Sequence, residues 1–260
     1  MSARTDLYLT MLRDLNSLAS IAGVKEGELQ KYFSPDTSQS FLYHLCSSLQ
    51  NSGMMTNTIL FRGINNPIIK EVMCNYDSTL SFKKYKGWQD IYNTFLSKGI
   101  LDKGSRKNKE TNWEKYCKGL YGGLQFLGEG GDSLIKELSS SKELNRDNLK
   151  RIKNISKRIH GLGFALTCDW LKECGCTWLA KPDTHLNDVI KALRNTGPVT
   201  DEEVLGEVFF WANEIKLCGI DPDITTYKLD RVIWLLCTGN FFLDKKSSGK
   251  DALIKKIKEE

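Results

Sequence analysis

The chain has 260 residues, of which 40% are apolar and 27% are charged, and its formal net charge is +5. This length is sufficient for one large domain or two smaller lobes, and the composition is that of a globular protein. No apolar run approaches the ~20 residues that span a bilayer, and charged residues interrupt the N-terminal segment. We therefore expect neither a membrane protein nor a signal peptide.

Apolar residues recur at three- and four-residue spacing along most of the chain, which predicts helices. Strand signals are weak, so the sequence predicts an all-α fold. Thr200 to Glu203 is a capping box, and Asp183 or Thr184 can cap the helix that follows them. We expect the tail after Asp244 to be frayed. The predicted helices are Leu7–Leu18, Phe41–Leu49, Trp88–Phe95, Trp113–Leu127, Leu149–Ile159, Leu162–Leu171, Leu186–Leu193, Val204–Leu217 and Leu229–Leu236.

The eight cysteines, at positions 46, 74, 117, 168, 174, 176, 218 and 237, show no disulfide-scaffold rhythm. Cys174 and Cys176 form a single C-x-C without a second pair at zinc spacing. Four closely spaced cysteines, which an iron–sulfur cluster needs, are absent. We predict free structural thiols in a reducing compartment, with no metal and no iron–sulfur cluster.

Positive charge gathers in two places. The segment Lys103–Lys109 (KGSRKNK) is predicted to be a flexible basic loop. The second cluster occupies a predicted helix and consists of Arg146, Lys150, Arg151, Lys153, Lys157 and Arg158. Such clusters are typical of nucleic-acid binding, although solvated helix faces account for them equally well.

The second basic cluster leads directly into the segment Ile159-His-Gly-Leu-Gly163, which joins two predicted helices. Glycine permits a positive φ and the close approach of a phosphate, and the amides that begin the second helix attract anions. A basic helix before such a turn favours binding to a DNA backbone without sequence readout. An ordinary turn between two helices is the alternative.

The segment Pro182-Asp-Thr-His185 places a carboxylate at a predicted helix start, with Asp183 twenty residues after Gly163. Helix capping alone would account for an aspartate here. Taken together, however, hairpin, intervening helix and aspartate resemble the helix-hairpin-helix DNA glycosylases, a superfamily that includes endonuclease III and the adenine and alkylbase glycosylases. Its members carry "LPGVG" where this chain has "IHGLG", and "VDTH" where it has "PDTH". The resemblance covers Leu149–Leu193 well and the remainder loosely.

The resemblance implies two helical lobes. We predict that residues 45–165 form a barrel lobe ending in the hairpin, and that 1–44 with 166–260 form the lobe carrying the catalytic aspartate. It further implies that Asp183 is catalytic. The implied DNA contacts are Lys153, Lys157, Arg158, His160, Gly161, Gly163 and Ala165, with His160 in place of the family's usual proline.

A shorter match, over Phe41–Phe61, implies that Gln50 and Asn51 lie near the flipped base or its partner. A polar helix end is the alternative interpretation. Trp178 is also a candidate for the base pocket, as are Trp88, Trp113, Tyr116 and Tyr121, although core packing explains each of these aromatic residues as well.

Bifunctional family members carry a lysine where this chain has Ala165, and a Schiff-base lyase step needs an amine. The sequence therefore predicts a monofunctional DNA glycosylase that uses water, unless a lysine enters from elsewhere. We expect a cytoplasmic monomer, nucleoid-associated if bacterial, that acts on double-stranded DNA, without a cofactor beyond a possible monovalent cation in the hairpin. An enzyme of base hypermodification and a non-catalytic DNA-binding module are the alternatives.

Overall fold

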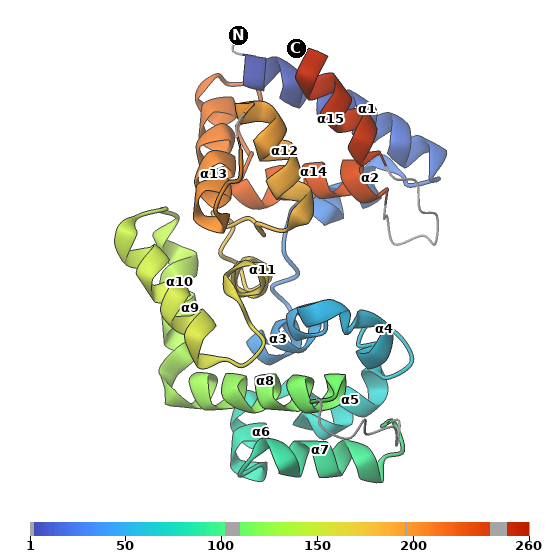
Figure 1. Ribbon diagram of the computed structural model, residues 1–260, viewed down its shortest axis with the longest axis vertical. Coiled ribbons are helices and arrows are strands. Elements are labelled where there is room, and N and C mark those ends of the chain that lie inside the picture. Colours follow the sequence, from blue (N-terminus) through green and yellow to red (C-terminus); the bar gives the residue numbers. More distant parts are fainter. Residues whose placement is uncertain (1–2, 102–109, 196, 240–248, 260) are drawn as a thin grey trace. The chain divides into compact units, whose positions relative to one another are not determined.

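A computed structural model describes residues 3–101, 110–195, 197–239 and 249–259 (Figure 1). Throughout these ranges the chain forms helices and connecting segments and no strand, which confirms the all-α prediction. None of the helices in the described ranges is long and apolar enough to cross a bilayer. The predicted basic loop Lys103–Lys109 lies outside the described ranges.

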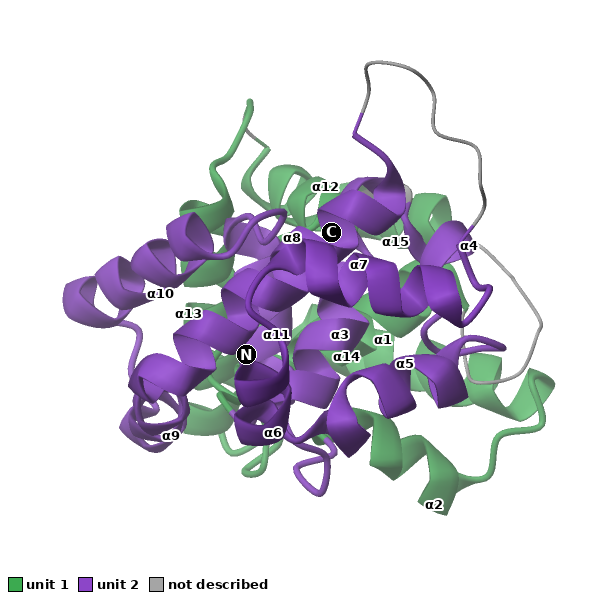
Figure 2. Ribbon diagram, turned by 90° about the horizontal axis from the view of Figure 1, so that it is seen from below, with its two compact units in different colours: residues 1–35, 176–260 green, residues 36–175 purple. Residues whose placement is uncertain are grey.

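The chain divides into two compact units, coloured separately in Figure 2. Unit 1 comprises residues 1–35 and 176–260, and unit 2 comprises residues 36–175. The predicted lobe boundaries, after residues 44 and 165, would cut through α3 (Phe41–Leu49) and α11 (Phe164–Glu173). These two helices instead pack against each other inside unit 2, where Trp170 Nε1 donates a hydrogen bond to the Phe41 carbonyl at 2.9 Å.

Unit 1 brings together the two ends of the chain. Trp211 Nε1 donates to the Arg4 carbonyl at 2.9 Å, and the Tyr8 hydroxyl donates to Asp221 at 2.6 Å, so the first helix is fastened to the C-terminal half. The capping box that begins at Thr200 is present as predicted. The helices of unit 1 are α1 (Ala3–Ile21), α2 (Glu26–Leu29), the 3-10 turn η1 (Gln30–Phe33), α12 (Thr184–Arg194), α13 (Asp201–Leu217), α14 (Thr226–Thr238) and α15 (Lys250–Glu259).

The expectation of a frayed tail was wrong, because α15 is a regular helix that packs on α12 and α14. Leu253 and Ile257, one turn apart, are both buried. Lys256 pairs with Asp14 on α1, and Lys250 pairs with Asp188 on α12. These anchors lie far away in the sequence, so the tail's own pattern does not reveal them.

Unit 2 is organised around α8, whose buried residues include Tyr116, Leu120 and Leu124. The Tyr116 hydroxyl donates to the Cys46 carbonyl on α3 at 3.1 Å. The helices of unit 2 are α3, η2 (Ser52–Met54), α4 (Thr56–Ile59), α5 (Asn66–Val72), η3 (Cys74–Tyr76), α6 (Ser78–Lys84), α7 (Trp88–Ser97), α8 (Asn112–Phe126), the π-type turn η4 (Leu127–Gly131), α9 (Asp132–Ser141), α10 (Arg146–Arg158) and α11.

Candidate functional site

The predicted hairpin is present in unit 2 as α10, a short turn and α11, and the two helices pack on each other. Ile159 and Leu162 are buried and anchor the turn, and the Leu162 amide donates to the Ile159 carbonyl at 3.1 Å. Gly161 has φ +76°, a conformation that glycine adopts without strain. Gly161 and Gly163 are exposed, so the turn presents backbone to solvent.

The start of α11 carries no side-chain cap. Gly163 occupies the N-cap position, and no side chain accepts a hydrogen bond from the first amides of the helix. The first internal bond runs from the Thr167 amide to the Gly163 carbonyl at 2.9 Å. Within the described residues, the amides of Phe164, Ala165 and Leu166 are therefore available to an external acceptor, and the helix dipole favours an anion there.

Three glycines on α8 lie where this helix meets the hairpin turn or α3, a signal that the sequence interpretation missed. A Cβ built at Gly119 would lie 2.8 Å from the His160 carbonyl oxygen and 2.7 Å from Leu49. A Cβ at Gly123 would lie 2.0 Å from Leu45, whereas one at Gly122 would make ordinary contacts at 3.4 Å or more. The close approach of α8 to α3 and to the turn thus depends on glycine at two of the three positions.

The predicted DNA-binding cations differ in their surroundings. Arg158 forms an ion pair with Glu129 at 2.5 Å and lies over the Phe126 ring, 5.3 Å from its centroid. Lys157 is exposed, and Lys153 is half-buried and has further interactions of its own. The predicted contacts on α10 are therefore not equivalent.

His160 lies at the exposed tip of the turn, with Nε2 3.5 Å from Glu110 Oε1. Lys118 donates to the same carboxylate oxygen at 2.6 Å, and this hydrogen bond is the main reason that the pKa of Glu110 is lowered. Lys118 also lies over the Trp88 ring, 4.9 Å from its centroid. Glu110 thus links the hairpin to α8, because its carboxylate lies close to both His160 and Lys118.

Asp183 belongs to unit 1 and is the N-cap of α12. Its Oδ1 accepts hydrogen bonds from the amides of His185 at 2.9 Å and Leu186 at 3.3 Å. The side chain is half-buried, and within the described residues no donor is assigned to Oδ2. The capping interpretation of Asp183 is therefore confirmed, and among the described residues the capping bonds use one of its two carboxylate oxygens.

Two polar atoms just after Asp183 are buried without a hydrogen-bond partner among the described residues. They are His185 Nδ1 and Asn187 Oδ1. In native proteins buried polar atoms are almost always satisfied, by protein groups or by ordered water. The first turns of α12 therefore carry more polar capacity than the helix itself uses.

The residues predicted to lie near a flipped base are placed differently. Gln50 is 3% exposed, and its Oε1 accepts a hydrogen bond from the Phe61 amide at 3.1 Å. Its side chain thus closes the loop between α3 and α5 and does not face outward. Asn51 is exposed and accepts a hydrogen bond from Thr56 at 3.2 Å. Trp178 is buried in unit 1, in accordance with the core-packing alternative.

A buried polar group between α3 and α11 was not anticipated. Asp169 accepts a hydrogen bond from Ser48 at 3.1 Å and lies 3.5 Å from the Lys172 ammonium. All three residues are buried. Buried charges persist only when they are paired, so this group fixes how α11, and with it the hairpin, packs in unit 2.

The cysteines are all free, and no group of three or more metal-ligating side chains comes together within the described ranges. Burial raises the pKa of Cys176 to about 12 and that of Cys237 to about 11. Both thiols are therefore protonated and unreactive near neutral pH.

No protein-family model, no curated protein and no solved structure matches this chain. Functional assignment consequently rests on the local geometry of the hairpin and of the α12 N-terminus.

Proposed function

We propose that the protein is a monofunctional DNA N-glycosylase, which hydrolyses the N-glycosidic bond of a flipped, damaged or modified base and leaves an abasic site. The observation that carries this proposal is the α10–α11 hairpin. A basic helix leads into an exposed glycine turn, and the helix that follows begins with Gly163 and three uncapped amides. This combination supports binding to a phosphodiester backbone without sequence readout.

Asp183 supplies the chemistry in this proposal. Cleavage of an N-glycosidic bond builds positive charge on the deoxyribose ring, and a carboxylate held near that ring stabilises the charge and orients the attacking water. Because Oδ1 accepts both helix amides, the capping bonds fix the orientation of the carboxylate. Oδ2 is then the oxygen that would act on the sugar or on the water.

The absence of a lysine at Ala165 supports hydrolysis over a lyase step. The second position of α11 carries a methyl group, which cannot form a Schiff base. Lys250, at the start of α15, is paired with Asp188 on α12. We therefore expect an intact strand after base release.

A non-catalytic DNA-binding module is the second candidate, and one observation favours it. Asp183 makes two capping bonds, which suffice to account for an aspartate at this position. In this case the hairpin would bind duplex DNA and no base would be released.

The two candidates separate in one experiment. The protein is incubated with duplexes that contain alkylated, deaminated, oxidised or hypermodified bases, and the free bases are identified by mass spectrometry. The glycosylase proposal predicts one class of free base and a matching number of abasic sites, without strand cleavage. Duplex binding without release of any base would favour the non-catalytic module. Replacement of the target base by another base would instead indicate an enzyme of base hypermodification.

A further inference from the structure

The cations of α10 fall into two sets with different surroundings. At about 100° per residue, Arg146, Lys150 and Lys157 lie within an arc of about 40°, and we call them the α10 stripe. Arg151 and Arg158 lie about 120° further round the helix, beside the buried face of Ile152 and Ile155.

Arg151 and Arg158 are both used inside unit 2. Arg151 pairs with Glu137 on α9 at 2.6 Å, and Arg158 pairs with Glu129 on η4 at 2.5 Å. Figure 1 shows α9 and α10 side by side, in accordance with the first of these pairs. These two arginines therefore fasten α10 to the preceding elements.

The stripe has no such partners. Arg146, Lys150 and Lys157 are exposed, and none of them forms an ion pair with the parts of the chain that the structure describes. Arg146 and Lys150 are four residues apart, a spacing at which like charges destabilise a helix. Arg146 also occupies the first turn, where the helix dipole disfavours a cation.

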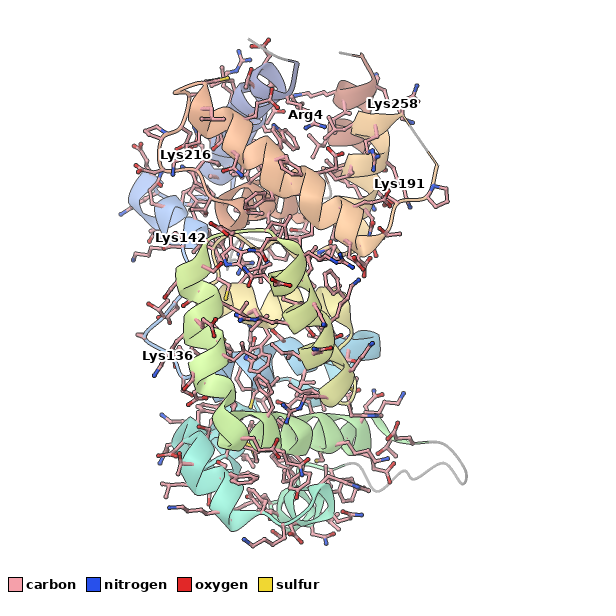
Figure 3. All side chains as sticks on the ribbon, turned by 90° about the vertical axis from the view of Figure 1, so that its left-hand side faces the viewer. Arg4, Lys136, Lys142, Lys191, Lys216 and Lys258 are labelled. Atoms are coloured by element: carbon pink, nitrogen blue, oxygen red, sulfur yellow. The ribbon has the colours of Figure 1, made fainter. Side chains whose placement is uncertain are left out.

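Among the described residues of unit 2, exposed cations occur elsewhere as well, but not in this arrangement. Lys136 and Lys142, labelled in Figure 3, lie on α9 and directly after it. Lys142 ends its helix in a left-handed conformation and continues no row of like charges. A row of like charges that costs helix stability is therefore a particular feature of α10.

We propose that the α10 stripe is a backbone-binding surface for double-stranded DNA, which extends the contact of the hairpin along the helix. From Arg146 to Lys157 the stripe is about 16 Å long, which corresponds to roughly five base pairs of duplex axis. Phosphates neutralise the repulsion within the stripe and release counterions. Arg158, although closer to the turn, acts in packing. This inference rests on the proposed DNA-binding function.

The structure provides a matched pair of variants to test it. Lys150→Gln with Lys157→Gln and Arg151→Gln with Arg158→Gln remove the same charge from the same helix at the same spacing. Binding to a short fluorescent duplex of mixed sequence is measured by anisotropy at several salt concentrations, together with the melting temperature. The lysine variant should bind at least ten-fold more weakly at about 0.1 M salt and lose about two units of salt slope.

The lysine variant should also keep or slightly raise its melting temperature, because like-charge repulsion is removed. The arginine variant should melt lower and keep most of its salt slope. Equal loss of slope in both variants, or loss in the arginine variant alone, would overturn the assignment. Weaker binding to single-stranded RNA with unchanged duplex binding would overturn duplex DNA as the partner. If the unaltered protein binds no duplex, the proposed function itself fails.

Discussion

The N-termini of α11 and α12 differ in whether a side chain caps their first backbone amides. Both α11 and α12 begin with backbone amides that have no partner inside the helix. At α12 the chain supplies its own anion, because Asp183 accepts hydrogen bonds from two of these amides. At α11 the cap is a glycine, so the amides remain open, and a basic helix leads into them. The absence of a side-chain cap at α11 is therefore as informative as its presence at α12.

The largest expected effect on stability concerns the contact between α8 and the turn that precedes α11. Gly119→Ala should destabilise the protein by about 1–3 kcal/mol, because the added methyl group collides with the His160 carbonyl and with Leu49. Gly122→Ala is the control, since its methyl group makes only ordinary contacts and alanine favours a helix. Chemical denaturation measures both. Equal destabilisation by the two variants would show that α8 does not hold the turn in this way.

The two glycines of the turn should differ as well. Gly161→Ala should cost about 1–2 kcal/mol, because φ is +76° at this position. Gly163→Ala should leave stability within about 0.5 kcal/mol, since φ is negative and nothing lies within 4 Å of the added Cβ. It should still weaken duplex binding, because the methyl group obstructs the approach of a phosphate. Unchanged binding by a stable Gly163→Ala variant would argue against an anion at α11.

At the N-terminus of α12, Asp183→Ala should lower stability by about 1 kcal/mol, the usual contribution of an N-cap. Asp183→Asn should cost little, because asparagine caps helices as well as aspartate does. Thermal unfolding of the two variants separates the capping bonds from the charge. A large loss of stability in Asp183→Asn would mean that the charge itself is structural.

The smallest expected effect is that of Glu129→Gln, which removes the exposed partner of Arg158. Exposed ion pairs contribute about 0–1 kcal/mol, so the melting temperature should fall slightly. Duplex affinity should change less than in the Lys150 and Lys157 double variant. A strong gain in affinity would indicate that Glu129 withholds Arg158 from DNA and would assign that arginine to the interface.

The features that sequence predicted well are local ones. The apolar spacing, the Thr200 capping box, the two glycines of the hairpin and the Asp183 cap all depend on residues within a few positions of one another. Side-chain chemistry and helix periodicity determine such features directly.

The features that sequence did not predict depend on distant partners. The glycines of α8 matter because of Leu45, Leu49 and His160. Gln50 is buried because its amide oxygen meets the Phe61 amide across a loop. The division of the α10 cations depends on acids of α9 and η4, and nothing in the helix sequence distinguishes Arg158 from Lys157. Tertiary packing decides these cases.

We propose that the Asp183 carboxylate does more than cap α12. The most direct test is the rate of base release by Asp183→Asn on the duplex that the unaltered protein acts on, measured together with melting temperature and duplex affinity. We predict that base release falls about 10²–10⁴-fold while melting and affinity stay unchanged. Base release at the unaltered rate, or a decrease that merely follows a loss of stability, would contradict the claim and leave Asp183 as a helix cap.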